Sequence, residues 1–220
     1  MKPTTICARA ALAAALLAPA ASRGDSSPYF SPVERRFMVE IAPASGLASL
    51  KAKDFAFTGA YKQEKLNGTM SAIPNLRLGL NIETEKMRYY ISAGGGALWN
   101  GALVAPMACL DAAALFKMAG TELDFGIGPH IVGQYFFGPG WKGDADASLS
   151  GGFGAGGGLA MTFGKPMGNW DIKVSVDYVH AGLKASDSAT WKATDGTLDL
   201  SGIAAQIGFV FRFDNADLTP

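Results

Sequence analysis

Two histidines are the side chains of this sequence best suited to acid–base or nucleophilic chemistry. Nucleophilic catalysis needs a hydroxyl or thiol within hydrogen-bond reach of such a base. His180 is followed by Ala181 and Gly182, so a serine two residues after the histidine is missing. The next serines, Ser186 and Ser188, fall in the following polar stretch. The sequence therefore predicts no catalytic residue.

The other histidine, His130, stands among glycines and apolar residues. A metal site needs several His, Cys, Asp or Glu ligands at suitable spacing, and no His or Cys lies near His130 in the sequence. We therefore expect a hydrogen-bonded interior histidine, and the sequence predicts neither a metal nor a cofactor. Cys109 is expected to be an inert apolar side chain.

Charged and polar side chains alternate with apolar ones in several stretches. Residues 75–83 place Arg77 and Glu83 on one face and leucine or isoleucine on the other. The stretch 200–213 does the same, with an apolar face that ends at Phe213. A period of two is that of a β-strand with one apolar face.

These patterns predict an all-β fold, an antiparallel up-and-down transmembrane β-barrel. The Asn100-Gly101 pair between apolar residues predicts a tight hairpin. Residues 111–120 are expected to form a connector, and ten strands remain the alternative to eight. The eight strands are expected at about 53–61, 75–83, 86–99, 102–110, 121–137, 148–163, 170–183 and 200–213.

The beginning of the chain has the pattern of a secretory signal peptide at residues 1–20, with Lys2 and Arg9 before an apolar run and a small-residue cleavage site. Residues 21–52 are expected to form a mature N-terminal extension, with at most a short strand. The barrel is expected to occupy residues 53–213, and residues 214–220 to form a tail.

The composition is that expected of an exported protein that has no membrane-spanning helix. Hydrophobic residues make up 49% of the chain, but the longest charge-free stretch, 89–110, contains glycines and a proline that would disrupt a helix. Without residues 1–20 the net charge is about −2, which gives no indication of nucleic-acid binding. One cysteine would remain in that chain, so no intramolecular disulfide is predicted.

If the phenylalanine face contacts lipid, the opposite face lines a lumen that eight strands leave just wide enough for side chains to fill. Opposite charges in such a space are expected to pair and to close it, and a narrow conducting pore is the alternative. Four inward glycines, at 152, 154, 156 and 158, are expected to be covered by bulky residues such as Arg77, Arg88 or Arg212. The predicted lumen charge network is Arg77, Glu83, Arg88, Glu122, Asp124, Asp171, Lys173, Asp177 and Arg212.

Aromatic residues near the predicted strand ends are typical of the girdles at a membrane interface. His180 falls beside one of them, on the apolar face of its strand. The predicted girdle is Tyr89, Trp99, Tyr135, Trp170 and Tyr178.

With its alternating strands, the phrase GIGPHIVGQYF from Gly126 and the terminal GFVFRF of 208–213, the chain resembles the eight-stranded outer-membrane barrels of Gram-negative bacteria. The type is that of the opacity proteins and the OmpA/OmpX transmembrane domains. The resemblance implies the cell outer membrane, with lipid and lipopolysaccharide around a monomeric barrel. It also implies insertion machinery that reads a terminal aromatic, although residues 214–220 follow Phe213 here.

The predicted function is a non-enzymatic outer-membrane barrel with a structural or surface-interaction role through its extracellular loops. One alternative is a lipid-modifying enzyme that uses His180. The position of His180 resembles that of the histidine in outer-membrane lipid A deacylases. Those enzymes have a His-x-Ser pair on a late strand, and the serine is missing here. The sequence also allows a narrow pore or a soluble periplasmic β-protein.

Overall fold

The computed structural model describes residues 33–48, 51–52, 55–59, 63–65, 69–100, 103–119, 123–141, 148–165, 168–187 and 191–213. The predicted signal peptide, the tail at 214–220 and Glu122 lie outside these residues. Within the part described, no helix has the length and hydrophobicity needed to span a membrane.

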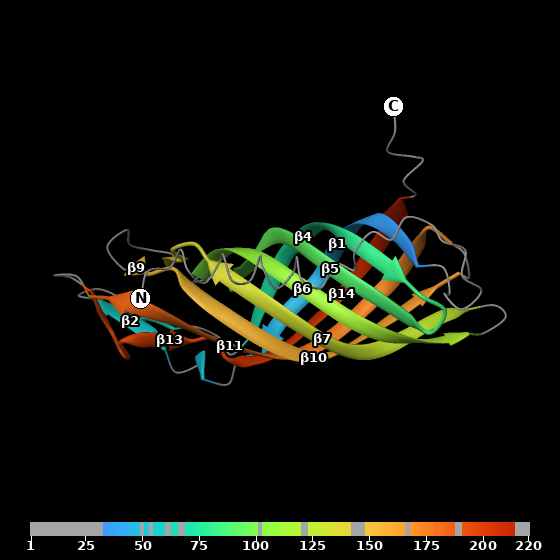
Figure 1. Ribbon diagram of the computed structural model, residues 1–220. Coiled ribbons are helices and arrows are strands. Elements are labelled where there is room, and N and C mark those ends of the chain that lie inside the picture. Colours follow the sequence, from blue (N-terminus) through green and yellow to red (C-terminus); the bar gives the residue numbers. More distant parts are fainter. Residues whose placement is uncertain are drawn as a thin grey trace, which may run out of the picture. The chain divides into compact units, whose positions relative to one another are not determined.

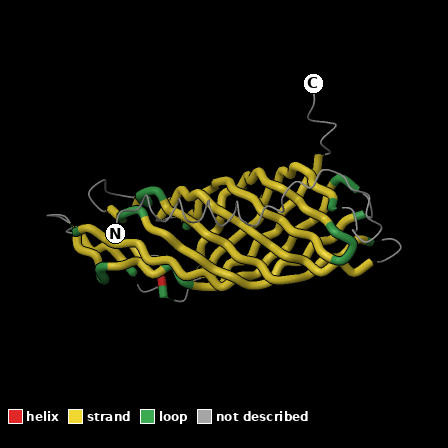
Figure 2. The backbone as a smooth tube through the Cα atoms, in the orientation of Figure 1, coloured by secondary structure: helices red, strands yellow, loops and turns green. Residues whose placement is uncertain are grey.

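Eight long antiparallel strands close into a ring (Figures 1 and 2). Each strand pairs with its neighbours in chain order, and the last strand pairs with the first, which confirms the predicted eight-stranded up-and-down barrel. The ring consists of β1 (Glu34–Ala48), β4 (Thr69–Glu83), β5 (Met87–Trp99), β6 (Leu103–Ala119), β7 (Asp124–Phe136), β10 (Gly152–Gly164), β11 (Trp170–Ser186) and β14 (Gly202–Phe213).

The register of the pairs fixes how the ring closes. We start at Ala181 on β11 and follow the paired residue on each successive strand around the barrel. The path returns to β11 at Asp171, which is ten residues from Ala181. A stagger of this kind requires strands tilted by roughly 35–45° to the barrel axis. Figure 2 shows this oblique course of the strands.

The connections differ in length at the two ends of the barrel. At one end, here called the turn end, residues 84–86, 120–123 and 165–169 join the strands. At the opposite end, the loop end, three of the four connections are long: 49–68, 137–151 and 187–201. These carry the short strands β2 (Ala56–Gly59), β3 (Gln63–Lys65), β8 (Gly140–Trp141), β9 (Ser148–Leu149), β12 (Trp191–Ala193) and β13 (Thr197–Asp199).

The prediction for the first strand is wrong. Residues 34–48, which were expected to lie outside the barrel, form β1 and join β4 to β14. The predicted strand at 53–61 supplies only β2, which belongs to a separate three-stranded sheet with β12 and β3. Phe55 and Phe57 do not face lipid, because both are buried among apolar side chains at the loop end.

The predicted connector at 111–120 is also wrong, because β6 continues to Ala119. Its inward row includes Cys109, Asp111, Ala113 and Leu115, which are all buried. Alanine and leucine occupy both faces of β6, so its period of two is hard to read in the sequence. With β6 at full length, all three turn-end connections are short.

The ring is apolar outside as well as along part of its inside. Exposed large apolar side chains are found on every ring strand, whereas a soluble barrel would bury its apolar residues. They include Ile41 on β1, Leu78 on β4, Trp99 on β5, Leu110 and Phe116 on β6, Ile131 on β7, Leu159 on β10, Val176 on β11, and Phe209 and Phe211 on β14.

The inside differs between the two ends. At the loop end, buried apolar side chains form what we call the apolar plug: Leu47, Ala52, Phe55, Phe57, Leu98, Leu103, Ala105, Met107, Phe136, Leu149, Ala181, Leu183, Leu198 and Leu200. Nearer the turn end, the buried inward residues are mostly charged or polar.

Inward glycines make room for side chains from neighbouring strands. A Cβ at Gly158 would lie 2.9 Å from Oδ1 of Asp177, and one at Gly156 would lie 2.8 Å from a methyl group of Val179. Side chains of the adjacent β11 therefore lie beside this glycine row, and Gly152, Gly156 and Gly158 are half-buried. None of the three arginines that were expected to cover the row is among the nearest neighbours of these glycines.

Gly94 offers a test of this packing. A Cβ there would lie 2.0 Å from the Leu76 carbonyl oxygen and 2.6 Å from the Cα of Arg77. We expect Gly94→Ala to lower the free energy of unfolding by about 1–3 kcal/mol, because the backbone must shift. The measurement is urea unfolding of the refolded barrel in detergent micelles, followed by tryptophan fluorescence.

Gly133→Ala is the matched control, because its Cβ would meet only the Phe153 ring, at 3.6 Å. We expect a change within about 0.5 kcal/mol for this variant. Equal unfolding midpoints for the two variants would contradict the packing argument.

Candidate functional site

Charged side chains from five ring strands and an amide from a sixth meet inside the barrel in what we call the central cluster. The strands β1, β4, β6, β7, β11 and β14 each place an inward residue at the same region of the lumen, and the charged members are almost completely buried. The central cluster consists of Glu40, Arg77, Asp111, His130, Lys173, Asp177 and Gln206.

Asp111 is at the middle of the central cluster. Its Oδ1 accepts a hydrogen bond from Lys173 Nζ at 2.7 Å, and its Oδ2 accepts one from an Arg77 guanidinium nitrogen at 2.8 Å. The same Oδ2 lies 2.8 Å from Nε2 of His130. One carboxylate thus contacts side chains from three other strands.

Glu40 occupies a similar position on the β1 side. Its Oε2 pairs with Lys173 Nζ at 3.2 Å and its Oε1 pairs with Arg77 at 3.3 Å. Gln206 completes the arrangement, because its amide donates to Glu40 at 2.7 Å while its carbonyl oxygen accepts from Arg77 at 2.7 Å. The first and last strands are therefore joined by side chains as well as by backbone pairing.

A second group, the turn-end cluster, surrounds Arg88. The guanidinium of Arg88 pairs with Glu83, Asp124 and Asp171. The guanidinium of Arg212 pairs with Glu83 at 2.6 Å and with Asp171 at 3.0 Å. The turn-end cluster consists of Glu83, Arg88, Asp124, Asp171 and Arg212, with Tyr90 and Lys117 at its edges.

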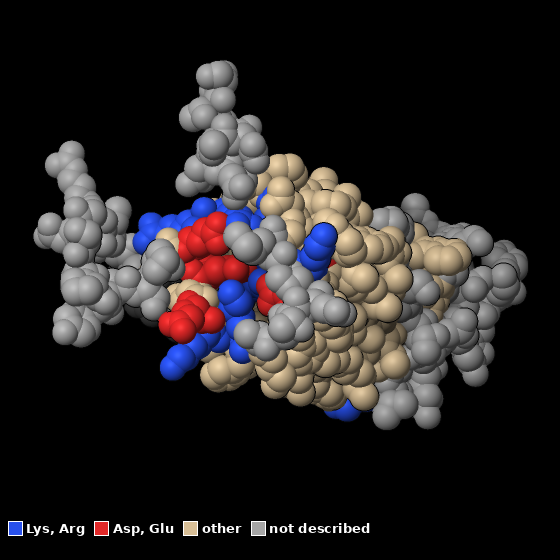
Figure 3. Space-filling view, turned by 90° about the vertical axis from the view of Figure 1, so that its right-hand side faces the viewer, with Lys and Arg blue, Asp and Glu red and all other residues tan. Residues whose placement is uncertain are grey.

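Figure 3 views the chain from the turn end and shows acidic and basic side chains gathered together beside a wall that is almost free of charge. Within the turn-end cluster the charges of Arg88, Arg212 and Lys117 balance those of Glu83, Asp124 and Asp171. Balanced pairing matters because removing one member of a buried ion pair leaves an uncompensated charge, which costs about 3–5 kcal/mol.

Eight of the nine residues predicted for the lumen are described, and they fall into these two clusters. The sequence reasoning missed Glu40 and Asp111, which lie in the segments that it had placed outside the strands. The alternation of Phe37, Val39 and Ile41 was a signal that could have placed Glu40 in the lumen.

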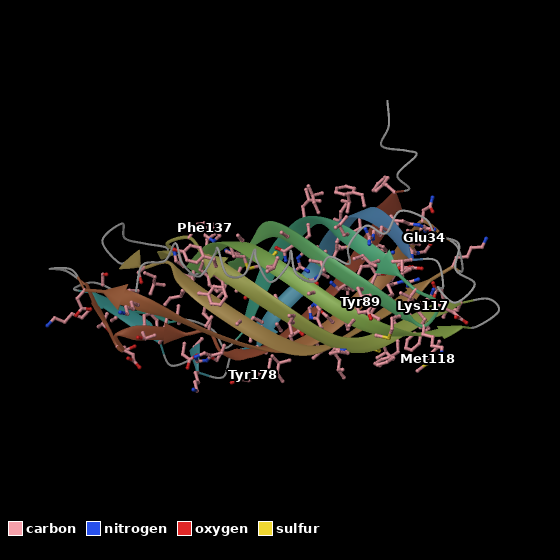
Figure 4. The ribbon with its side chains drawn as sticks, in the orientation of Figure 1. Glu34, Tyr89, Lys117, Met118, Phe137 and Tyr178 are labelled. Carbon is pink, nitrogen blue, oxygen red and sulfur yellow. The ribbon has the colours of Figure 1, made fainter. Side chains whose placement is uncertain are left out.

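The predicted girdle residues lie on the outward face. Trp99, Tyr135, Trp170 and Tyr178 are exposed to a similar degree, and Tyr89 somewhat less. Figure 4 shows Tyr89 towards the turn end, on the side of Lys117 and Glu34, and Tyr178 further towards the loop end. The loop tryptophan side chains at 141 and 191 are not among those described.

His180 contacts a serine that the sequence had not suggested. Its Nδ1 lies 2.5 Å from Oγ of Ser201, because the residues face each other across β11 and the start of β14. Only 3% of Ser201 is exposed. Asp199 accepts a hydrogen bond from the Ser201 backbone and pairs with Lys51, whereas the carboxylate of a catalytic triad bonds to the imidazole. These contacts fit a hydrogen bond that joins the ends of two neighbouring strands better than they fit a catalytic triad.

Among the described residues, no three His, Cys, Asp or Glu side chains are placed to share a metal ion. The buried thiol of Cys109 accepts from Nε of Arg77 at 3.2 Å, so this cysteine is a neighbour of the central cluster.

No protein-family model matches the chain, and no curated protein is found to match it. Solved structures that are similar to this chain include two outer-membrane proteins. One is neisserial surface protein A, with 10% identity and a TM-score of 0.38, over 80% of this chain and 97% of that chain. The other is the outer membrane protein OprG from Pseudomonas aeruginosa, with 15% identity and a TM-score of 0.40, over 81% of this chain and 96% of that chain. The barrel architecture rests on the strand pairings of this chain.

Lys173 is the best position at which to test the ion pairing. Lys173→Met keeps much of the side-chain volume but leaves Asp111 and Glu40 with one partner fewer. We expect the free energy of unfolding to fall by about 3–5 kcal/mol, because buried negative charge is left uncompensated. Denaturant unfolding of the refolded barrel gives the value.

Lys192→Met is the control, because Lys192 is exposed on β12 and its loss should change stability by less than about 0.5 kcal/mol. Adding Glu40→Gln to Lys173→Met should restore part of the lost stability, because it removes one unpaired charge. A double variant less stable than Lys173→Met would contradict the proposed pairing.

Proposed function

We propose that this chain is an integral outer-membrane barrel without enzymatic activity, which acts structurally or through its loop-end surface. The observation that carries the proposal is the combination of a closed ring with exposed large apolar residues on all eight strands. Contiguous apolar surface of this extent is rare on soluble monomers, and it is stable where it contacts lipid. This argues against a soluble periplasmic protein.

The outer membrane is proposed because bacterial single-chain barrels with an even number of antiparallel strands belong there. Such barrels have short periplasmic turns and longer extracellular loops. We therefore assign the turn end to the periplasm and the loop end to the exterior. A secretory signal at 1–20 would be consistent with this assignment.

The proposed partners follow from the same surfaces. Outer-membrane lipid and lipopolysaccharide would contact the apolar wall and the aromatic residues, and the insertion machinery would act on β14, whose outward row ends at Phe213. The ring leaves no ring strand with an unpaired edge, so one chain completes the barrel and a monomer is proposed.

A narrow pore is less well supported. The apolar plug fills the lumen at the loop end, and the two ion clusters fill it towards the turn end. An ion would have to displace buried side chains at both levels. Interaction is therefore assigned to the loop end, where β2, β3 and β12 form a small sheet and Lys51 and Lys192 are exposed.

The orientation can be tested by cysteine labelling in intact cells. Lys192→Cys on the loop end and Lys86→Cys on the turn end replace exposed lysines by the same residue. We expect a membrane-impermeant maleimide to label position 192 before lysis and position 86 only after lysis. The unsubstituted chain gives the background, which should be low because Cys109 is buried and Cys7 belongs to the predicted signal peptide.

Labelling of position 86 in intact cells, or of neither position, would contradict the proposed orientation. Migration of the purified chain on a gel provides a separate check of the barrel. Heat-dependent migration is expected, and its absence together with solubility in the absence of detergent would contradict a membrane barrel.

The contact between His180 and Ser201 is the one observation that favours a second candidate, a lipid A-modifying hydrolase. His180→Asn and Ser201→Ala remove the candidate base and nucleophile separately. We expect mass spectrometry to find the same lipid A species with both variants as with the original chain. A species that disappears with both variants, while the barrel level is unchanged, would establish the enzyme.

A further inference from the structure

The lumen contains a cavity of about 40 Å³ where the apolar plug meets the central cluster. Its lining includes Leu98 and Met107 of the apolar plug, and Asp111, His130 and Asp177 of the central cluster. Two more oxygens in its lining, Ser45 Oγ and Asn75 Oδ1, are buried and have no hydrogen-bond partner among the described residues. Because one water needs roughly 10–15 Å³ of such space, water fits here and would give both oxygens a partner.

The imidazole of His130 contacts a carboxylate at each nitrogen. Nδ1 lies 2.7 Å from Oδ1 of Asp177, and Nε2 lies 2.8 Å from Oδ2 of Asp111. A neutral imidazole has one N–H and one lone pair, so it can donate to only one of the two. At the other nitrogen, a lone pair would face a carboxylate lone pair at hydrogen-bond distance. An imidazolium has an N–H at each nitrogen, so it can donate a hydrogen bond to both carboxylates at the observed distances.

The charge count leads to the same result. Arg77 and Lys173 carry positive charge into the central cluster, and Glu40, Asp111 and Asp177 carry negative charge. A proton on His130 makes the sum zero, and its loss leaves one negative charge without compensation in a buried space. The other polar neighbours, Gln206 and Cys109, contact Arg77 and supply no balancing charge.

We propose that the central cluster is a site that binds one proton. The proton makes His130 an imidazolium, which donates one hydrogen bond to Asp111 and one to Asp177 inside the closed lumen. The bound proton is a structural ligand that joins β6, β7 and β11. The inference goes beyond the proposed membrane function and does not depend on which partner binds the loop end.

The direct test is ¹⁵N NMR of the imidazole rings in an untagged barrel, labelled at histidine and refolded in detergent micelles. The chain has two histidines, so His180→Gln assigns the signals. At pH 7.5 we expect both ring nitrogens of His130 to carry protons. A neutral ring, with one nitrogen unprotonated at this pH, would overturn the proposal.

Asp177→Asn is the matched variant, because Arg77 and Lys173 then balance Glu40 and Asp111 without the proton. An amide at 177 can also donate to a neutral imidazole nitrogen. We expect His130 of this variant to be neutral at pH 7.5. A ring that stayed doubly protonated would contradict the charge argument.

Unfolding at different pH provides the second measurement. An unfolded histidine releases its proton near about pH 6.5, whereas the native cluster keeps it, so stability falls as the pH rises above that value. The unfolding equilibrium constant of the original barrel should rise up to tenfold per pH unit while only the native state holds the proton. Asp177→Asn should show a much flatter dependence, and equal slopes would overturn the proposal.

Discussion

The constraint on which this barrel depends is that charge inside a narrow, closed ring must be compensated by other side chains. Eight strands leave an interior that side chains fill, so little water is available to solvate an ion there. The two ion clusters meet this constraint by contacts between neighbouring strands and also between strands that are not neighbours in the ring. Inward glycines are part of the same solution, because Gly94, Gly158 and Gly164 leave space for Arg77, Asp177 and Asp171.

The closed lumen also determines which surfaces remain for interaction. Buried ion pairs and the apolar plug occupy the interior, and the outer wall presents side chains suited to lipid. The His180–Ser201 contact is partly buried and lies just before the start of β14, where it joins the end of β11 to the neighbouring strand. Under the proposed function, specific recognition belongs to the long connections at the loop end, because surface connections of this kind generally tolerate sequence change.

The sequence predicted the strands in which polar and apolar residues alternate strictly, such as β7 and β11, and with them the inward position of His130 and Lys173. It did not predict β1, because the alternation there is short and a register shift between Ile41 and Ala44 interrupts it. It missed the second half of β6, residues 111–119, because small apolar residues occupy both faces. The pairing of His180 with Ser201 depends on register across the sheet, which local periodicity does not contain. The same holds for the contacts of Asp111.

The contact between Glu40 and Gln206 joins residues 166 positions apart in the chain. Neither the ring nor the central cluster can be completed before β14 has been made and has reached β1. A nascent chain that stops short of β14 would have two open strand edges and a set of unmatched charges. Loop-closure entropy for such distant contacts makes this step slow. Assembly is therefore expected to be all-or-none and to end with the joining of the two ends of the barrel.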